Sequence, residues 1–366
     1  MRKRILSLLL GMVMVTSLAV ACGSNKDTST NESEEQSTEE SAEESTEDSD
    51  VQADAVEQKT VFVTPEWVKS VIDGNQEESD DYIILEASWG TYEESPDYVD
   101  GHIPGAIHVD IASIEDEPYW NIKEPEDVEQ AMLDLGITKD KTVILYGSDV
   151  SGTCRVAYAY LWAGVENVKV LDGSLTAWNA AGYDLDQTIE EATVADSFGT
   201  TVPAHPEYWI SIEDVKDKLE NDSNFKLVSI RSKEEFEGVT SGYSYIDRAG
   251  EPEGAVWGHA GSDPYHMEDY LHDDGTYITS DEMFEMWSDS DFTTDNELAF
   301  YCGTGWRATI PWLLCYEAGI ENMKLYDGGW YQWQMNDDYP VQVGDPASGD
   351  VEYTTVGELP TDKAAK

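Results

Sequence analysis

The stretch that decides the fold is Phe300–Thr309, which reads FYCGTGWRAT. It follows an apolar run, Leu298–Tyr301, that predicts a buried strand, and the apolar residues within 310–314 predict one face of a helix. Two glycines free the backbone of the loop between them. Several unpaired backbone N–H groups at the helix start can therefore point at the sulfur of Cys302. Because this helix terminus and Arg307 are both positive, the setting suits a thiolate; the alternative is a buried structural cysteine.

The loop resembles the active-site loop of the rhodaneses, sulfurtransferases that carry sulfur as a cysteine persulfide. In that family the loop opens with the nucleophile, has glycine in fourth place and often ends in arginine, as Cys302–Arg307 does. Related phosphatases have one more residue between the cysteine and the arginine, so the spacing implies sulfur chemistry rather than phosphate or arsenate chemistry. The resemblance implies catalytic roles for Cys302 and Arg307. It also implies that substrate is bound by Gly303, Thr304, Gly305 and Trp306.

The chain contains an internal repeat. Val143–Gly147 matches Leu298–Cys302, Gly164–Gly173 matches Gly319–Gly328, and all pairs lie at one constant spacing. Strands alternate with helices in each copy, which predicts an α/β fold with a mostly parallel sheet in each. The predicted segments are a signal peptide at 1–22, a linker at 23–58, a first rhodanese-like domain at 59–190, a second at 204–345 and a C-terminal tail at 346–366.

Only the second copy carries the residues of a reactive site. The first copy has Gly147 where the second has Cys302, and glycine cannot carry sulfur. Arg231 follows a strand whose end resembles the rhodanese motif in which an arginine faces the cysteine, and the first copy has Ser88 there. This is the pattern of two-domain sulfurtransferases with a silent first copy. Two departures from the family are Ser229, where aspartate is usual, and a long insert at 238–254.

The N-terminus predicts export. Three basic residues at 2–4 precede an apolar run, Ile5–Leu18, that is shorter than the roughly 20 residues of a membrane span. Ala19–Gly23 resembles a bacterial lipobox, so we expect Cys22 to be lipidated and the protein to be anchored to the outer face of the cell membrane. The alternative is ordinary cleavage and a secreted protein. The acidic, Ser- and Thr-rich linker that follows predicts a solvated spacer.

The charge limits the partners. The formal net charge is -55 over 366 residues, which argues against nucleic acid and anionic membrane surfaces. The same field opposes anionic sulfur donors, although screening limits its reach to roughly 8 Å. Any anion site must therefore consist of local donors.

Other candidate residues have simpler interpretations. His102 and His108 lack zinc-ligand spacing and are interpreted as structural, so no metal or cofactor is expected. Cys154 and Cys315 could pair with each other or with Cys302 in an exported protein, and the sequence leaves this open. We expect all three to be unpaired in the active form.

The resemblance implies a two-step reaction. Cys302 attacks the outer sulfur of a donor such as thiosulfate, Arg231 and Arg307 hold the anionic end, and a thiophilic acceptor such as cyanide or a thiol removes the sulfur. The loop start Cys302-Gly303-Thr304-Gly305 resembles that of the mercaptopyruvate enzymes of the family, whereas Arg307 favours an inorganic anion. Thiosulfate is the prediction. A non-catalytic, lipid-anchored sulfur carrier is the alternative from another functional class.

Overall fold

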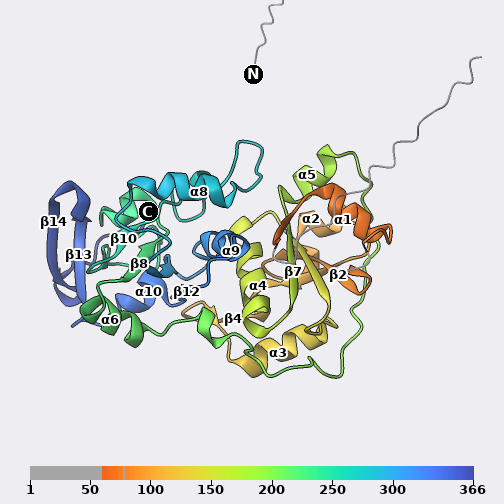
Figure 1. The fold of residues 1–366 in the computed structure, drawn as a ribbon, viewed down its shortest axis with the longest axis horizontal. Coiled ribbons are helices and arrows are strands. Elements are labelled where there is room, and N and C mark those ends of the chain that lie inside the picture. Colours follow the sequence, from red (N-terminus) through yellow and green to blue (C-terminus); the bar gives the residue numbers. More distant parts are fainter. Residues whose placement is uncertain (1–59, 77–78) are drawn as a thin grey trace, which may run out of the picture. The chain divides into compact units, whose positions relative to one another are not determined.

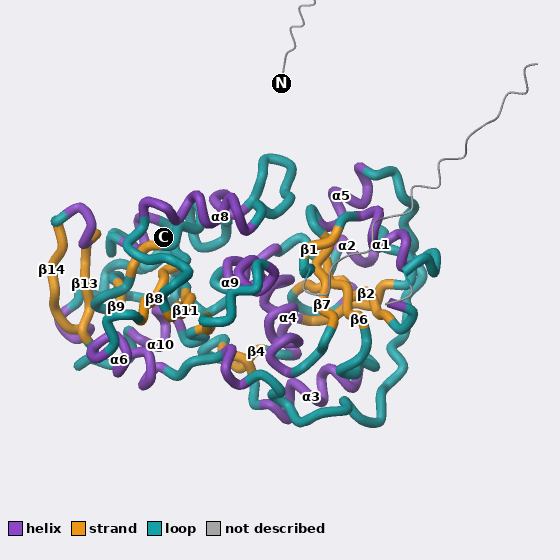
Figure 2. Tube along the Cα trace, viewed as in Figure 1, coloured by secondary structure: helices purple, strands orange, loops and turns teal. Residues whose placement is uncertain are grey.

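A computed structural model describes residues 60–76 and 79–366 (Figures 1 and 2). The predicted signal peptide, the predicted lipidation site Cys22 and the whole predicted linker 23–58 lie outside the described residues. Within those residues, no helix has the length and apolar character needed to cross a membrane.

The first copy is built on a five-stranded parallel sheet in the order β1-β7-β6-β2-β3. Its strands are β1 (Phe62–Val63), β2 (Tyr82–Ser88), β3 (Ala106–Asp110), β6 (Thr142–Tyr146) and β7 (Asn167–Leu171). Its helices are α1 (Pro65–Ile72), α2 (Pro96–Val99), α3 (Pro125–Asp134), α4 (Val150–Ala163) and α5 (Ser174–Ala180), and a hairpin joins β4 (Glu115–Asp116) to β5 (Asn121–Ile122).

The second copy has a four-stranded parallel sheet in the order β10-β8-β11-β12. Its strands are β8 (Phe225–Ser229), β10 (Val256–Trp257), β11 (Glu297–Tyr301) and β12 (Met323–Leu325). Its helices are α6 (Ile212–Asn221), α7 (Lys233–Phe236), α8 (Ser280–Met286), α9 (Thr309–Glu317) and α10 (Gly329–Trp333). The two mostly parallel sheets flanked by helices confirm the predicted fold class.

The strand register confirms how the two copies correspond. Glu86 of β2 pairs with Tyr146 of β6, and Ser229 of β8 pairs with Tyr301 of β11. Since β6 and β11 are the matched strands of the repeat, β2 corresponds to β8. Two residues further on, Ser88 corresponds to Arg231, as the sequence predicts.

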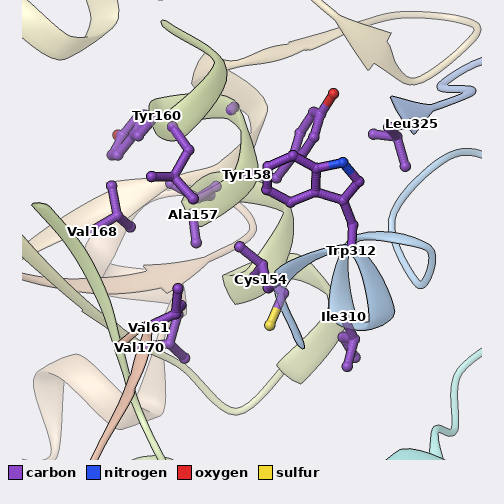
Figure 3. Close-up of a cluster of buried hydrophobic side chains, with 14 of the residues drawn as sticks. Val61, Cys154, Ala157, Tyr158, Tyr160, Val168, Val170, Ile310, Trp312 and Leu325 are labelled. Carbon is purple, nitrogen blue, oxygen red and sulfur yellow. The ribbon is translucent and has the colours of Figure 1, made fainter. Parts of the chain in front are cut away.

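Helix α9 differs from its prediction. The sequence suggests one apolar face, but every residue from Thr309 to Cys315 is buried. The reason is that α4 of the first copy covers α9, so that both copies contribute to one apolar core. Figure 3 shows Trp312 of α9 against Tyr158 of α4, whose ring centroids lie 4.8 Å apart at 88°. The helix that follows the Cys302 loop is therefore fixed by both halves of the chain.

The C-terminal stretch 346–366, predicted as a tail, packs on the second copy. Its strand β14 (Asp350–Thr355) pairs antiparallel with β13 (Pro340–Asp345), which in turn pairs with β9 (Glu251–Pro252). Beyond β14, Lys363 accepts a hydrogen bond from Ser241 N at 2.9 Å and donates one to Asp247 O at 2.9 Å. The last residues thus hold the insert 238–254 in place.

Candidate active site

Cys302 lies directly after β11, at the carboxyl end of the parallel sheet. Its carbonyl accepts a hydrogen bond from Trp330 N at 2.9 Å, and that of Gly303 accepts one from Tyr331 N at 3.0 Å, both at the start of α10. In a trans peptide the C=O and the following N–H point in opposite directions. The N–H groups of Gly303 and Thr304 therefore face away from α10.

The rest of the loop adds further free donors. Within the described residues, none of the backbone N–H groups from Gly303 to Ala308 donates to a protein acceptor; the first that do are Thr309 N, to Trp306 O at 3.0 Å, and Ile310 N, to Arg307 O at 3.2 Å. Successive free N–H groups in a turn form a concave site for anions. The loop therefore has the free local donors that the sequence predicts for an anion site.

Glycine is required at Gly305. Its φ is +85°, and a Cβ there would lie 2.5 Å from Oδ1 of Asp327 and 2.7 Å from the Asp327 carbonyl oxygen. At Gly303 a Cβ would lie 2.2 Å from the ring of Tyr243, which comes from the insert 238–254. The loop is therefore enclosed on two sides by segments distant in the sequence.

A buried cluster of charges lies beside the loop. Arg307 makes a two-pronged ion pair with Glu235, with N–O distances of 2.9 and 3.0 Å. Arg231 donates from Nε to Glu235 at 3.3 Å and from Nη1 to Glu251 at 2.6 Å. All four side chains are buried, and Tyr301 Oη donates to the other oxygen of Glu251. Two guanidinium groups are thus matched by two carboxyl groups.

The two carboxyl groups have opposite pKa shifts. Burial raises the pKa of Glu235, but Arg307 and Arg231 outweigh that effect and hold it at about 2. Burial also raises the pKa of Glu251, and Arg231 only partly offsets this, so that it reaches about 8. Glu235 is therefore the permanent counter-charge of the cluster.

The structure does not bring Arg231 to the substrate side. Besides its two carboxylate partners, it donates to Gly250 O at 2.8 Å and to Ser241 O at 3.1 Å. Each of its three guanidinium nitrogens thus has a protein acceptor, and it does not line the cavity described next. Its ion pair with Glu235 lies in the interior, where both side chains are fully buried. Arg231 holds Glu235, which holds Arg307.

A cavity of about 560 Å³ opens above the loop. Thr304, Trp306 and Arg307 line it, but Cys302 does not and is only 1% exposed. The other lining residues are mostly aromatic or come from the start of α4: Trp89, Trp120, Tyr243, Tyr245, Pro264, Tyr265, Ser148, Asp149, Val150 and Ser151. Both copies therefore form its wall.

Sequence reasoning missed Glu235, Tyr243 and Glu251. Glu235 lies in α7 outside the motifs of the loop, and the other two lie in the insert 238–254. Tyr243 Oη accepts a hydrogen bond from Arg307 Nη2 at 3.3 Å. The one available signal was the insert itself, whose position suggested that it shapes the pocket.

The remaining candidates have structural contacts. The ring nitrogens of His102 face Tyr98 O at 2.6 Å and Thr188 O at 3.0 Å, and those of His108 face Glu86 at 2.7 Å and Gly90 O at 2.8 Å.

Cys154, Cys302 and Cys315 are all free and buried in this structure. Burial raises the pKa of the Cys154 thiol to about 12, and it raises that of Cys315 as well. Neither residue is close to being a thiolate at neutral pH, which leaves Cys302 as the nucleophile candidate.

Comparison with known proteins gives consistent matches. The model of the rhodanese-like domain matches residues 64–181 and 211–336, inside the two predicted domains. The thiosulfate sulfurtransferase YnjE of Escherichia coli is 39% identical over 287 residues, which cover 77% of this chain and 65% of that protein. The crystal structure of YnjE aligns with a TM-score of 0.74, covering 78% of this chain and 68% of that one.

Two further matches differ in their named substrates. Thiosulfate/3-mercaptopyruvate sulfurtransferase 2 of Arabidopsis thaliana is 27% identical over 290 residues, covering 71% of this chain and 82% of that protein. An anaerobic ergothioneine biosynthesis enzyme from Chlorobium limicola, solved with trimethyl histidine, is 34% identical with a TM-score of 0.73, covering 79% of this chain and 72% of that one.

Proposed function

The chain belongs to the rhodanese-like family, and we propose that it is a sulfurtransferase that carries sulfane sulfur as a persulfide on Cys302. The observation that carries this proposal is the position of Cys302 between β11 and a loop with free N–H groups from Gly303 to Ala308. The names of the relatives support the same chemistry.

The first half-reaction loads the cysteine. The Cys302 thiolate attacks the outer sulfur of thiosulfate, the S–S bond of the donor breaks, and sulfite leaves with the bonding electron pair. Arg307 lines the cavity, and its buried Nε has no partner within the described residues, so it can donate to the departing anion. Arg231 acts through Glu235 by holding Arg307 in place.

The second half-reaction transfers the sulfur from the Cys302 persulfide to an acceptor. A persulfide places its outer sulfur about 2 Å beyond the cysteine sulfur, toward an acceptor that arrives through the cavity. The acceptor attacks this sulfur, the persulfide bond breaks, and the thiolate of Cys302 is restored. The free loop N–H groups stabilise the thiolate in both directions.

Thiosulfate-to-cyanide transfer tests the proposal. The parent should form thiocyanate and Cys302→Ala should form none, whereas Cys315→Ala, which removes another buried thiol of the same copy, should keep most activity. If the parent makes no thiocyanate, mass spectrometry after thiosulfate or mercaptopyruvate should still detect one added sulfur on Cys302. An adduct without turnover supports the carrier alternative, and no adduct with either donor contradicts the proposal.

A specific observation favours an organic cation as acceptor. Six aromatic side chains line the cavity, and Trp89 lies 5.4 Å from Trp120 and 5.9 Å from Trp306 by ring centroids. Asp149 adds a carboxylate to the wall, while the charge of Arg307 is matched by Glu235. Aromatic faces with a carboxylate attract quaternary ammonium groups. The Chlorobium limicola enzyme solved with trimethyl histidine has such a substrate.

Calorimetry can test this second candidate. Trimethyl histidine should bind at least about tenfold more tightly than histidine, which lacks the three methyl groups, because each cation–π contact contributes roughly 0.5–2 kcal/mol. Trp89→Ala should weaken this binding and leave sulfur loading from thiosulfate intact. Equal binding of the two compounds would exclude the ammonium group as the recognised feature.

The site of action is part of the proposal. The basic start at residues 2–4, the apolar run Ile5–Leu18 and the small residues before Cys22 support export and lipid attachment at the outer face of the cell membrane. In cells fed labelled palmitate, the full chain should incorporate label and Cys22→Ser should not. Release of an unlabelled parent into the medium would instead support a secreted protein.

A further inference from the structure

The silent first copy makes direct contact with the loop that carries Cys302. Glu115 of β4 is fully buried, and its Oε2 accepts a hydrogen bond from Trp306 Nε1 at 3.0 Å. Its other oxygen accepts one from Arg155 Nε at 2.7 Å, and Arg155 belongs to α4. A loop residue of the second copy is therefore held by a carboxylate of the first.

A second line of contacts reaches the same loop through Asp327. Arg155 Nη1 lies 2.5 Å from Asp327 Oδ1, and Ile122 N donates to Asp327 Oδ2 at 2.7 Å. Asp327 belongs to the second copy, whereas Arg155 and Ile122, which contact its carboxylate, belong to the first. Asp327 in turn closes the space beside Gly305. It also lies two residues before α10, whose second and third N–H groups donate to the carbonyls of Cys302 and Gly303.

We propose that Glu115 and Arg155 are positioning residues that set the conformation of the Cys302 loop, so that the first copy completes the active site of the second. A plainer interpretation is an ion cluster that only holds the two copies together. The two differ in what happens at Cys302 when the cluster is weakened but the copies stay docked.

The charge of the cluster gives the proposal a pH signature. The charged groups that face Glu115 are Arg155 of α4 and Asp327 after β12. Burial raises the pKa of Glu115 to about 7; Arg155 opposes the rise and Asp327 adds to it. Glu115 therefore takes up a proton near pH 7, and its carboxylate is fully charged only above that pH.

The test uses the full chain and the rate at which iodoacetamide alkylates Cys302, followed by mass spectrometry. Cys302 is 1% exposed, so a loosened loop should expose it. Glu115→Gln should raise the alkylation rate at pH 8 by about fivefold, the effect of one hydrogen bond, and lower the rate of sulfur loading by a similar factor. The ratio of variant to parent should approach one as the pH falls below 7. Trp306→Phe keeps an aromatic ring at this position and removes Nε1. It should change both rates in the same direction as Glu115→Gln does.

A matched control separates positioning from docking. Glu317 of α9 also joins the two copies, accepting hydrogen bonds from Val61 N at 2.7 Å and Phe62 N at 3.2 Å, and it is not part of the loop. Glu317→Gln should leave Cys302 alkylation unchanged. The proposal is overturned if Glu317→Gln and Glu115→Gln behave alike, or if neither Glu115→Gln nor Trp306→Phe alters alkylation. Because alkylation needs no sulfur donor, the result stands even if the proposed sulfur transfer fails.

Discussion

The two copies have matching strands, β6 and β11, but the segments that follow these strands differ. After β6, three residues suffice before α4 starts at Val150, whereas after β11 the helix α9 starts only at Thr309. In the first copy, Asp149 caps the helix: its Oδ1 accepts from the N–H groups of Ser151 and Gly152, each at 3.0 Å. At the constant spacing of the repeat, the second copy has Thr304 in place of Asp149.

The two copies differ in how many of these N–H groups have an acceptor. In the first copy Gly147 N donates to Ser174 Oγ, and the N–H groups of residues 151–153 donate to Asp149. In the second copy, none of the N–H groups from Gly303 to Ala308 has a protein acceptor among the described residues. A segment that could have been one more turn of α9 is a loop with free donors, which suits an anion. The second copy holds this loop open with the buried charge cluster beside it. The first copy lacks the arginine of that cluster, because it has Ser88 at the position of Arg231.

The largest effect is expected from removing the counter-charge of these arginines. Glu235→Gln leaves Arg307 and Arg231 buried with only Glu251, and breaking a buried pair in this way typically costs about 3–5 kcal/mol. Urea unfolding at pH 7 should show a loss of this size, and thiocyanate formation should fall to background. If Glu235→Gln instead kept wild-type stability at pH 7 and lost only its activity, Glu235 would act in the reaction and not in stabilising the fold.

The same variant has a defined pH dependence. The folded pKa of Glu235 is about 2, below its unfolded value of about 4.3. Its contribution to stability is therefore present above pH 4.3 and is lost as the pH falls from there toward 2. The difference in unfolding free energy between parent and Glu235→Gln should shrink over this window. A difference that stays constant down to pH 2.5 would contradict the assigned pKa.

The next effect concerns the shape of the loop. Gly305→Ala places a Cβ 2.5 Å from Asp327 Oδ1 in a backbone with φ +85°, whereas Gly319→Ala has a similar φ of +77° with nothing within 4 Å. The strained backbone alone costs roughly 1–2 kcal/mol, so Gly319→Ala should lose about that much and keep its activity. Gly305→Ala should lose more stability and nearly all sulfur loading. Equal losses in thermal unfolding and activity would show that space around Gly305 does not matter.

A third change asks whether the first copy can be made reactive. Gly147→Cys restores the nucleophile, but its Cβ would lie 2.2 Å from Ala87 O and 2.6 Å from Thr153 Oγ1. Overpacking of this kind typically costs about 1–3 kcal/mol. With Cys302→Ala in the same chain, no sulfur should load at position 147, as judged by mass spectrometry. Loading there would mean that the cysteine alone, and not the free loop, confers reactivity.

The sequence predicted the features that follow from local pattern and repetition. The apolar run Leu298–Tyr301 predicted a strand, and it lies within β11 (Glu297–Tyr301). The segment that matches it in the repeat, Val143–Gly147, begins within β6 (Thr142–Tyr146). The repeat correctly placed Ser88 opposite Arg231 because both strands keep the same register with their neighbours.

The sequence did not predict what depends on contacts between distant segments. Arg231 has the expected position on the chain, but its guanidinium faces Glu235 and Glu251 rather than the cavity in which a sulfur donor would bind. The roles of Glu115 and Asp327 follow from the packing of one copy on the other, which no repeat or motif describes. The tail 346–366 forms β14 because the edge of β13 was available to it.

The smallest effect measures what the insert 238–254 adds to the second copy. Tyr243→Phe keeps the ring against Gly303 and removes only the acceptor for Arg307 Nη2, which still reaches Glu235 at 3.0 Å. A net hydrogen bond is worth about 1 kcal/mol, so stability and thiocyanate formation should each fall slightly. Tyr326→Phe is the control, since its buried hydroxyl has no partner within the described residues and its loss should be neutral. Because burial keeps the pKa of Tyr243 above its usual value, the pH profile of activity should not move. A loss as large as that of Glu235→Gln would make Tyr243 a reacting group and give the insert a catalytic role.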